Sequence, residues 1–172
     1  MTQFWGTHHN KRDLKGRVSI PAPFRTALKG QAEASAPVSL VVRPSHKHAC
    51  IEAWPIGEFQ RLAEPLDQLE IFSDDQEDLA AVLYPDALRL ECDREGRVLL
   101  PEPLVRHAGL GDLVTFLGLG RIFQIWEPVG AEQRRAAARE RVLRRGLTLP
   151  SASSSPGPAL ASPPGLPAAG PI

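Results

Sequence analysis

The sequence predicts an α+β protein, mainly β, in which two copies of one unit combine into a single pseudo-symmetric barrel. The first observation is a repeat at an offset of eighty residues: Asp13, Gly16, Arg17, Val18, Pro21 and Pro23 align with Asp93, Gly96, Arg97, Val98, Pro101 and Pro103. The second is a pair of apolar runs rich in β-branched and aromatic residues, a composition typical of strands, which end at Trp54 and Trp126. Each copy spans about 40 to 45 residues, near the size below which a chain rarely forms its own core, so we expect the two copies to close one barrel together.

The expected elements follow in the same order in both halves. Residues 1–55, the first half, predict a strand, a glycine turn, a second strand, a proline-bounded helical turn and two further strands. Residues 56–87 predict linking helices, the first of which Pro65 is expected to bend or split. Residues 88–149 repeat the first pattern and add an arginine-rich helix. Residues 150–172 contain Pro, Ala, Ser and Gly without any charge, which predicts a disordered tail.

The bulk composition excludes some classes of protein. No run of eighteen apolar residues is present, so no membrane span is expected. The N-terminal residues have no apolar segment of the secretory kind, which favours the cytoplasm. Cys50 and Cys92 lack CxxC spacing and are expected to be reduced and inert, with a structural disulfide as the alternative.

The zero net charge of the 172 residues hides a strong segregation of charge. Residues 58–78 hold eight carboxylates and one arginine, whereas residues 132–145 hold six arginines and two glutamates. Residues 8–17 are also basic. This pattern is compatible with a phosphate-binding surface and equally with association between acidic and basic faces of identical subunits.

The repeated turn is the candidate functional motif. Asp13 is expected to accept backbone N–H groups at the start of the turn, and Gly16 permits the positive φ that the turn needs. Lys15 and Arg17 would then project near the tip, where an arginine can pair bidentately with guanine in a DNA major groove. The second copy has Glu95 in place of Lys15. On these residues alone, DNA binding and a turn that merely satisfies the symmetry of the barrel remain alternatives.

Three stretches are distinctive: THHNKRDLKGRVSIPAPFRTAL, DREGRVLLPEPLVRHAGL and VTFLGLGRIFQIWEP. Together they resemble the MraZ family of bacterial transcriptional regulators, and in particular its alphaproteobacterial members, and the resemblance covers roughly residues 1–145. It implies an AbrB-like fold, a double-psi barrel of two swapped-hairpin halves, in a cytoplasmic, nucleoid-associated protein. It further implies a homo-oligomeric ring that binds double-stranded DNA at tandem G-rich direct repeats in the promoter of the division and cell-wall gene cluster.

The resemblance also implies which residues contact DNA. The D-x-x-x-R motif of the family corresponds to Asp13 and Arg17 in the first half and to Asp93 and Arg97 in the second. Lys15 is expected to contact phosphate from its charge and position, and Lys11 and Arg12 to extend the same surface. Glu95 departs from the pattern and makes the second turn less favourable near phosphate, which points to Arg17 as the principal reader of DNA.

Other functions are weaker alternatives. An oligomeric scaffold without specific DNA readout would use the same barrel and the same segregated charges. His46, His48 and Cys50 would share one face if they lay on a strand, but no fourth ligand is evident, so we expect neither metal nor cofactor. No nucleophile motif or pair of catalytic carboxylates indicates an enzyme. The three tryptophans are expected to anchor the core or a subunit interface.

Overall fold

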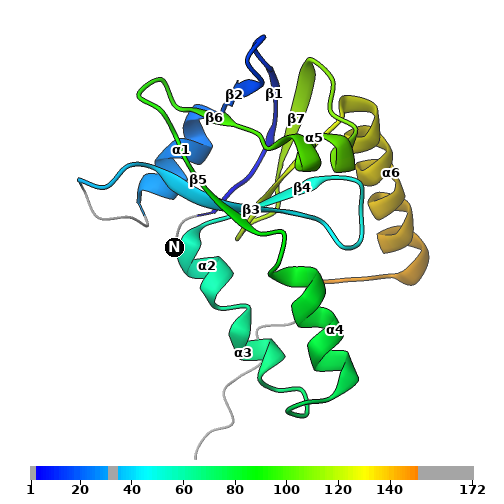
Figure 1. Ribbon diagram of the computed structural model, residues 1–172. Coiled ribbons are helices and arrows are strands. Elements are labelled where there is room, and N and C mark those ends of the chain that lie inside the picture. Colours follow the sequence, from blue (N-terminus) through cyan, green and yellow to red (C-terminus); the bar gives the residue numbers. More distant parts are fainter. Residues whose placement is uncertain (1–2, 31–34, 151–172) are drawn as a thin grey trace, which may run out of the picture. The chain divides into compact units, whose positions relative to one another are not determined.

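The computed structural model describes residues 3–30 and 35–150. The chain divides into two compact units, Met1–Ala137 and Ala138–Ile172, and the strands and candidate site described below lie in the first. The predicted tail lies outside the described residues except for Pro150. Strands and helices follow one another along the chain in the order β1 (Thr7–Lys11), β2 (Arg17–Ser19), α1 (Ala22–Lys29), β3 (Ser39–Pro44), β4 (Ile51–Trp54), α2 (Ile56–Gln60), α3 (Ala63–Leu66), α4 (Asp74–Leu83), β5 (Leu88–Glu91), β6 (Arg97–Leu99), α5 (Glu102–Ala108), β7 (Leu113–Gly118), β8 (Phe123–Trp126) and α6 (Pro128–Arg145) (Figure 1).

The sheet is assembled from strands that the two halves exchange. Its order is β1-β7-β8-β4-β3-β5, with every pair antiparallel. The first strand of each half pairs with the third strand of the other half, because β1 pairs with β7 and β5 pairs with β3. Replacing each strand of one half by its counterpart in the other reproduces the same order, so the unit has a pseudo-twofold axis. The α+β class and the two repeats that the sequence predicts are therefore confirmed.

A separate two-stranded ribbon, β2 with β6, lies on this axis. Val18 pairs with Val98, its own equivalent in the repeat, and these two residues are the centre of the ribbon. The sheet itself is not closed, which differs from the expected closed barrel: β1 and β5 are its two edges. Each of these strands leads through a glycine turn into the ribbon, whose strands pair with each other instead of extending the sheet.

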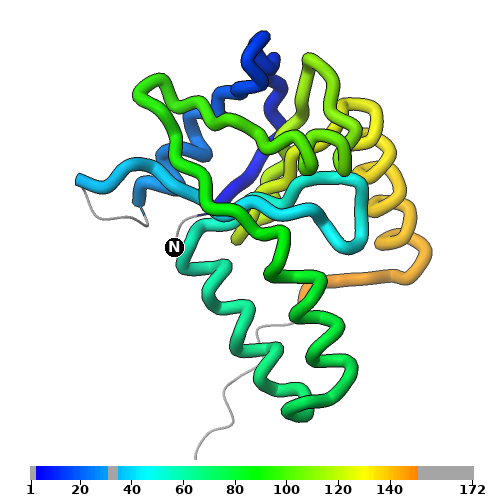
Figure 2. The backbone as a smooth tube through the Cα atoms, in the orientation of Figure 1, coloured from blue at the N-terminus to red at the C-terminus, as the bar shows by residue number. Residues whose placement is uncertain are grey.

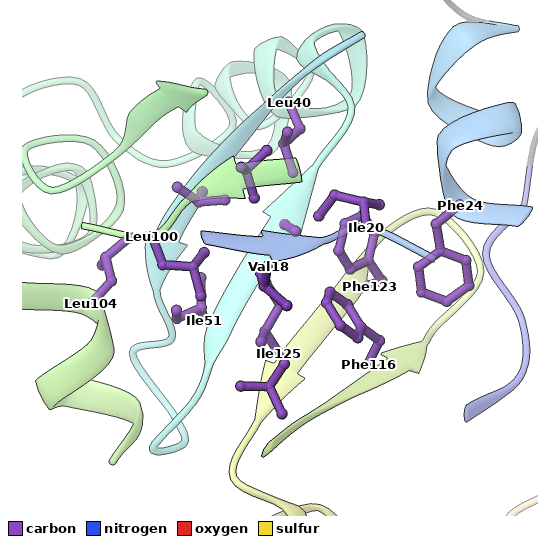
Figure 3. Close-up of a cluster of buried hydrophobic side chains, with 14 of the residues drawn as sticks. Val18, Ile20, Phe24, Leu40, Ile51, Leu100, Leu104, Phe116, Phe123 and Ile125 are labelled. Atoms are coloured by element: carbon purple, nitrogen blue, oxygen red, sulfur yellow. The ribbon is translucent and has the colours of Figure 1, made fainter. Parts of the chain in front are cut away.

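One hydrophobic core fills the space between the ribbon, the sheet and the helices α1 and α5. Val18 of the ribbon points into it together with Phe24, Phe116 and Phe123 (Figure 3). Val98 belongs to the same buried cluster. Phe24 of α1 lies 4.9 Å from Phe123 of β8, measured between ring centroids. Because residues of both halves share this core, burial of apolar surface stabilises the two halves as one unit.

Prolines mark the starts of the helices α1 and α5. The N-caps of α1 and α5 are Pro21 and Pro101, and each helix has a further proline in its first turn, where the missing N–H costs no hydrogen bond. Between the halves, α2 and α3 are separate helices, so the predicted split near Pro65 is confirmed. Together with α4 they form a helical hairpin that extends away from the sheet (Figure 2). None of the helices in the described ranges is long and apolar enough to cross a membrane.

Candidate nucleic-acid interface

The first turn is held by one carboxylate. Oδ1 of Asp13 accepts the backbone N–H groups of Lys15 and Arg17, each at 2.9 Å, and Oδ2 accepts Nε–H of Arg17 at 2.8 Å. Two backbone hydrogen bonds close the turn. The N–H of Asp13 donates to the carbonyl of Arg17, and the N–H of Gly16 donates to the carbonyl of Asp13. Gly16 has φ +81°, a conformation that residues with a Cβ rarely adopt.

The second turn repeats these bonds. Oδ1 of Asp93 accepts the N–H groups of Glu95 and Arg97 at 3.0 and 2.8 Å, and Oδ2 accepts Nε–H of Arg97 at 2.9 Å. Gly96 has φ +78°. The two turns are also joined to the opposite strands, because Ile20 N–H donates to the carbonyl of Gly96 and Leu100 N–H donates to the carbonyl of Gly16. The motif Asp-x-x-Gly-Arg therefore builds the same turn at either end of the ribbon.

Alternation along the ribbon places both arginines on its outer face. Since Val18 and Val98 point into the core, their neighbours in each strand point outward. Arg17 pairs with Leu99 and Arg97 pairs with Ser19, so the two guanidinium groups occupy diagonal positions on this face. Their side chains are 31% and 29% exposed, enough for the planar groups to reach a ligand without leaving the turn.

The two arginines differ in how fully they are engaged. Nη2 of Arg97 donates to Glu95 at 3.2 Å, and Nη1 lies 4.0 Å from Oδ2 of Asp13. Arg17 uses only its Nε–H within the described part of the chain, where both of its Nη groups lack a hydrogen-bond partner. The guanidinium of Arg17 consequently keeps four N–H donors for a ligand, whereas that of Arg97 is surrounded by three carboxylates.

The turns also shift the acidity of the groups that form them. The backbone N–H of Arg17, followed by its guanidinium and the N–H of Lys15, lowers the pKa of Asp13 against the opposing effect of desolvation. The N–H of Arg97 and its guanidinium lower the pKa of Asp93 in the same way. The side-chain hydrogen bond to Asp93 in turn raises the pKa of Arg97. Both aspartates and Arg97 are therefore charged at neutral pH.

The remaining basic residues of the first turn occupy different environments. Lys11 and Lys15 are exposed, and in the part of the chain that the structure describes their ammonium groups have no hydrogen-bond or ion-pair partner. Arg12 instead donates from Nη1 to the carbonyls of Leu110 and Gly111 at 3.2 and 3.1 Å. The guanidinium of Arg12 thus fastens the turn to the segment between α5 and β7.

One basic residue escaped the sequence comparison. Arg94 occupies the tip of the second turn, at the position that Leu14 holds in the first, and both side chains are exposed. The pair of Leu14 and Arg94 lies next to the pair of Lys15 and Glu95 in the repeat. Alignment of every turn position at the eighty-residue offset would have identified Arg94. Its side chain gives the second turn a positive charge, whereas Glu95 replaces the cation that Lys15 provides in the first.

The alternative sites do not assemble. His46, His48 and Cys50 lie in the loop between β3 and β4 and not on a strand, so the shared face that a metal site requires does not form. The described residues contain no group of three or more His, Cys, Asp or Glu side chains that could hold a metal ion. Both cysteines are free. Trp126 is buried and bonded to Gln124, whereas Trp5 is 78% exposed and is not a core residue.

Several known proteins resemble this chain over most of its length. The chain matches the family described as "MraZ protein, putative antitoxin-like" over residues 3–81 and 83–141. It is 56% identical to a "Transcriptional regulator MraZ" of Gluconacetobacter diazotrophicus over 151 residues, 88% of this chain and 94% of the relative. A protein of the same name from Gluconobacter oxydans is 54% identical over 164 residues, 92% and 99% of the two chains. One from Rhodospirillum rubrum is 39% identical over 137 residues, 78% and 86% of the two chains.

Proposed function

Because the chain belongs to the MraZ family, we propose that it binds short G-rich direct repeats in the promoter of a division and cell-wall gene cluster, as a ring of identical subunits. The relatives are named transcriptional regulators, so the chain is a DNA-binding regulator and not an enzyme. Its place of action would be the cytoplasm, on the nucleoid.

The guanidinium of Arg17 carries this proposal. A guanine offers two acceptors, O6 and N7, in the major groove, and an arginine with two unoccupied Nη groups matches them bidentately. Asp13 fixes the side chain through Nε and leaves those groups pointing away from the turn's own bonds. A preorganised arginine loses less conformational entropy on binding than a freely rotating one, which favours recognition by a small contact surface.

The surrounding cations would hold the ribbon against the DNA backbone. A two-stranded ribbon fits the width of the major groove, and the exposed Lys11 and Lys15 flank Arg17 where phosphates would lie. Arg94 would contribute the corresponding contact from the second turn. Arg12, whose guanidinium bonds to two carbonyls, would act by positioning the first turn.

The second turn is expected to contribute less to base recognition. Glu95 takes one Nη group of Arg97 and brings a negative charge beside it, which opposes the approach of phosphate. Asp93 and Arg97 would therefore mainly maintain the turn and supply a weaker contact. In this arrangement each subunit offers one strong and one weak reading turn.

A ring suits such a small recognition surface. A single turn reads only a few base pairs, but several identical turns that meet tandem repeats make the later contacts intramolecular and raise avidity by about 10²–10⁴. Direct repeats match a head-to-tail arrangement better than a twofold dimer. Because a rigid ring cannot follow straight DNA over many sites, the DNA would bend or the ring would distort.

The experiment is a fluorescence-anisotropy titration with three duplexes of equal length that carry one G-rich repeat, three such repeats or the scrambled sequence. We expect the three-repeat duplex to bind most tightly and the logarithm of affinity to fall linearly with the logarithm of salt concentration. Equal affinity for the repeat and scrambled duplexes would contradict specific recognition. Absence of binding to all three at low salt would favour the oligomeric scaffold, for which the segregated charges are the supporting observation.

A further inference from the structure

The tip of the α2–α4 hairpin presents two apolar side chains to solvent. Ile71 is 68% exposed and Phe72 is 94% exposed, in the loop between α3 and α4 at the end of the hairpin farthest from the sheet (Figure 1). Phe72 has φ +65°, and among the described residues it alone combines a side chain with a positive φ. A bulky residue in this conformation costs free energy, so the backbone here holds Phe72 outward against its own preference.

The bonds around Phe72 keep it in this position. Ser73 is the N-cap of α4 and its Oγ accepts the N–H of Gln76 at 3.2 Å. Oε1 of Gln76 in return accepts the N–H of Phe72 at 3.0 Å. This reciprocal arrangement is a variant of the capping box, which fixes the direction in which the chain enters a helix. The exposed phenyl ring is consequently presented by an ordered support.

A pocket of about 570 Å³ opens at the other end of the same hairpin, between its helices and the sheet. Leu62, Leu66, Leu69, Leu79 and Leu83 line its apolar wall. Arg43 and Glu52, a buried cross-strand ion pair at 2.8 Å, lie on the opposite side, and Nε of Arg43 has no hydrogen-bond partner among the described residues. The volume falls within the range of binding pockets in proteins and exceeds what one aromatic side chain fills.

The charges around the tip and the pocket are complementary. Glu70, Asp74 and Asp75 flank the tip, whereas Lys47 is exposed at the rim of the pocket. Insertion of an apolar tip with an acidic collar into an apolar pocket with a basic rim would therefore be guided by electrostatic attraction. Aromatic side chains that enter such pockets are the usual energetic anchors of protein interfaces.

The position of the hairpin in the repeat gives the contact a direction. Residues 56–83 occur once, between the halves, so the tip and the pocket break the pseudo-twofold symmetry of the sheet. We propose that Phe72 of one copy of this chain inserts into the pocket between α3, α4 and the β3–β4 loop of the next copy. Since the two surfaces differ, the contact is heterologous and generates a ring when its rotation closes. This inference rests on the proposed ring and identifies the surfaces that join its subunits.

The primary test is the mass of the assembly by light scattering after size exclusion. Phe72→Asp is expected to reduce the wild-type oligomer to single chains of 18.7 kDa. Val129→Asp is the matched control, because Val129 is also exposed and lies outside the tip and pocket, and it should keep the wild-type mass. Phe72→Asp should still bind the one-repeat duplex, since the ribbon is unchanged.

A mixing experiment tests the direction of the contact. Leu66→Arg blocks the pocket but leaves the tip intact, and Phe72→Asp does the reverse. The mixture should therefore form pairs that contain one chain of each kind and grow no further. If Leu66→Arg fails to fold by circular dichroism, Lys47→Glu is the second pocket variant, because Lys47 is exposed and its change leaves the core intact. Lys47→Glu should raise the protein concentration at which half of the assembly dissociates at least tenfold.

The outcomes separate this inference from the function on which it rests. A wild-type oligomer that survives Phe72→Asp, or two folded variants that do not pair, would overturn the proposed contact and leave the ring standing. A wild-type chain that is monomeric at all concentrations would overturn both, while binding to the one-repeat duplex would still support DNA recognition by the ribbon.

Discussion

Arg97 extends its guanidinium across the ribbon toward Asp13, the carboxylate of the opposite turn, with Nη1 4.0 Å from Oδ2. Asp13 therefore faces two arginines, because its own partner Arg17 lies 2.8 Å away. Groups that share a partner in this way are energetically coupled, so a substitution in one turn is expected to affect the other. The two turns are therefore expected to act as one site.

Replacement of Arg17 by alanine should weaken binding to the one-repeat duplex by about 10- to 100-fold, because a bidentate contact to guanine contributes about 1–3 kcal/mol. Arg97→Ala should weaken it less than tenfold, since Glu95 and two aspartates already engage that guanidinium. Anisotropy at one fixed salt concentration measures both effects, and thermal unfolding shows whether each variant is folded. Equal losses would contradict the unequal roles of the two turns.

Replacement of Glu95 by lysine should strengthen DNA binding. The change releases Nη2 of Arg97 and gives the second turn the cation that Lys15 supplies in the first. We expect a steeper salt dependence, by about one unit of slope for one added phosphate contact. Glu64→Lys makes the same change of charge in the helical hairpin and should leave the slope near that of the wild type. Similar slopes for the two variants would indicate a general effect of net charge.

Acidification should break the side-chain hydrogen bonds of both turns only below the ordinary pKa of aspartate. The pKa of Asp13 and that of Asp93 are lowered from 3.8 by backbone and guanidinium hydrogen bonds. A carboxyl whose pKa is lower in the folded state stabilises the fold above its unfolded pKa and loses that contribution as pH falls through the folded value. Carboxyl NMR titration should therefore give midpoints below 3.8 for these two groups. A midpoint at or above 3.8 would show that the turn bonds do not persist in solution.

Replacement of Gly118 by alanine should destabilise the protein strongly. A Cβ on Gly118 would lie 2.5 Å from the backbone nitrogen of Trp5 and would displace the N-terminal segment that places Phe4 in the core. A disturbance of this kind costs about 1–3 kcal/mol of unfolding free energy. Gly57→Ala is the control, because a Cβ there meets nothing within 4 Å. Urea unfolding of the two variants makes the comparison, and equal midpoints would contradict the close approach.

The native thiols should resist modification. Burial raises the pKa of Cys50 to about 12 and that of Cys92 to about 11, so the reactive thiolate is scarce at neutral pH. A chromogenic disulfide reagent at pH 8 should react with the denatured chain at least a hundred times faster than with the native one. Rapid reaction of the native protein would show that one of these sites opens readily.

The parts of the structure that short sequence patterns could predict are those held by nearby residues. Asp13 and Arg17 are four positions apart and make their bonds within one turn, and Pro101 sets the start of α5 by its own geometry. The strands and the split of the first linking helix were likewise predicted from local residue patterns. These features depend on local propensity and on hydrogen bonds that a few neighbouring residues satisfy.

The features that the sequence did not reveal depend on partners far along the chain. Arg12 was expected to extend the DNA-binding surface. Its guanidinium instead bonds to carbonyls near residue 110, which the pairing of β1 with β7 brings close. Arg43 is 2% exposed and paired with Glu52 across β3 and β4, where the second half has Leu117 and Gln124. Strand register decides both environments, and a one-residue shift would reverse them.

The pairing of β1 with β7 also bears on how the chain is made. Thr7 meets Leu117 in the sheet, so a ribosome must synthesise most of the folded unit before the first strand can find its partner. Contacts of such long sequence separation slow folding, because a large loop has to close first. Until then the edge of β1 is open to β7 of a neighbouring nascent chain, and exchange between chains on one polysome is the characteristic hazard of this topology.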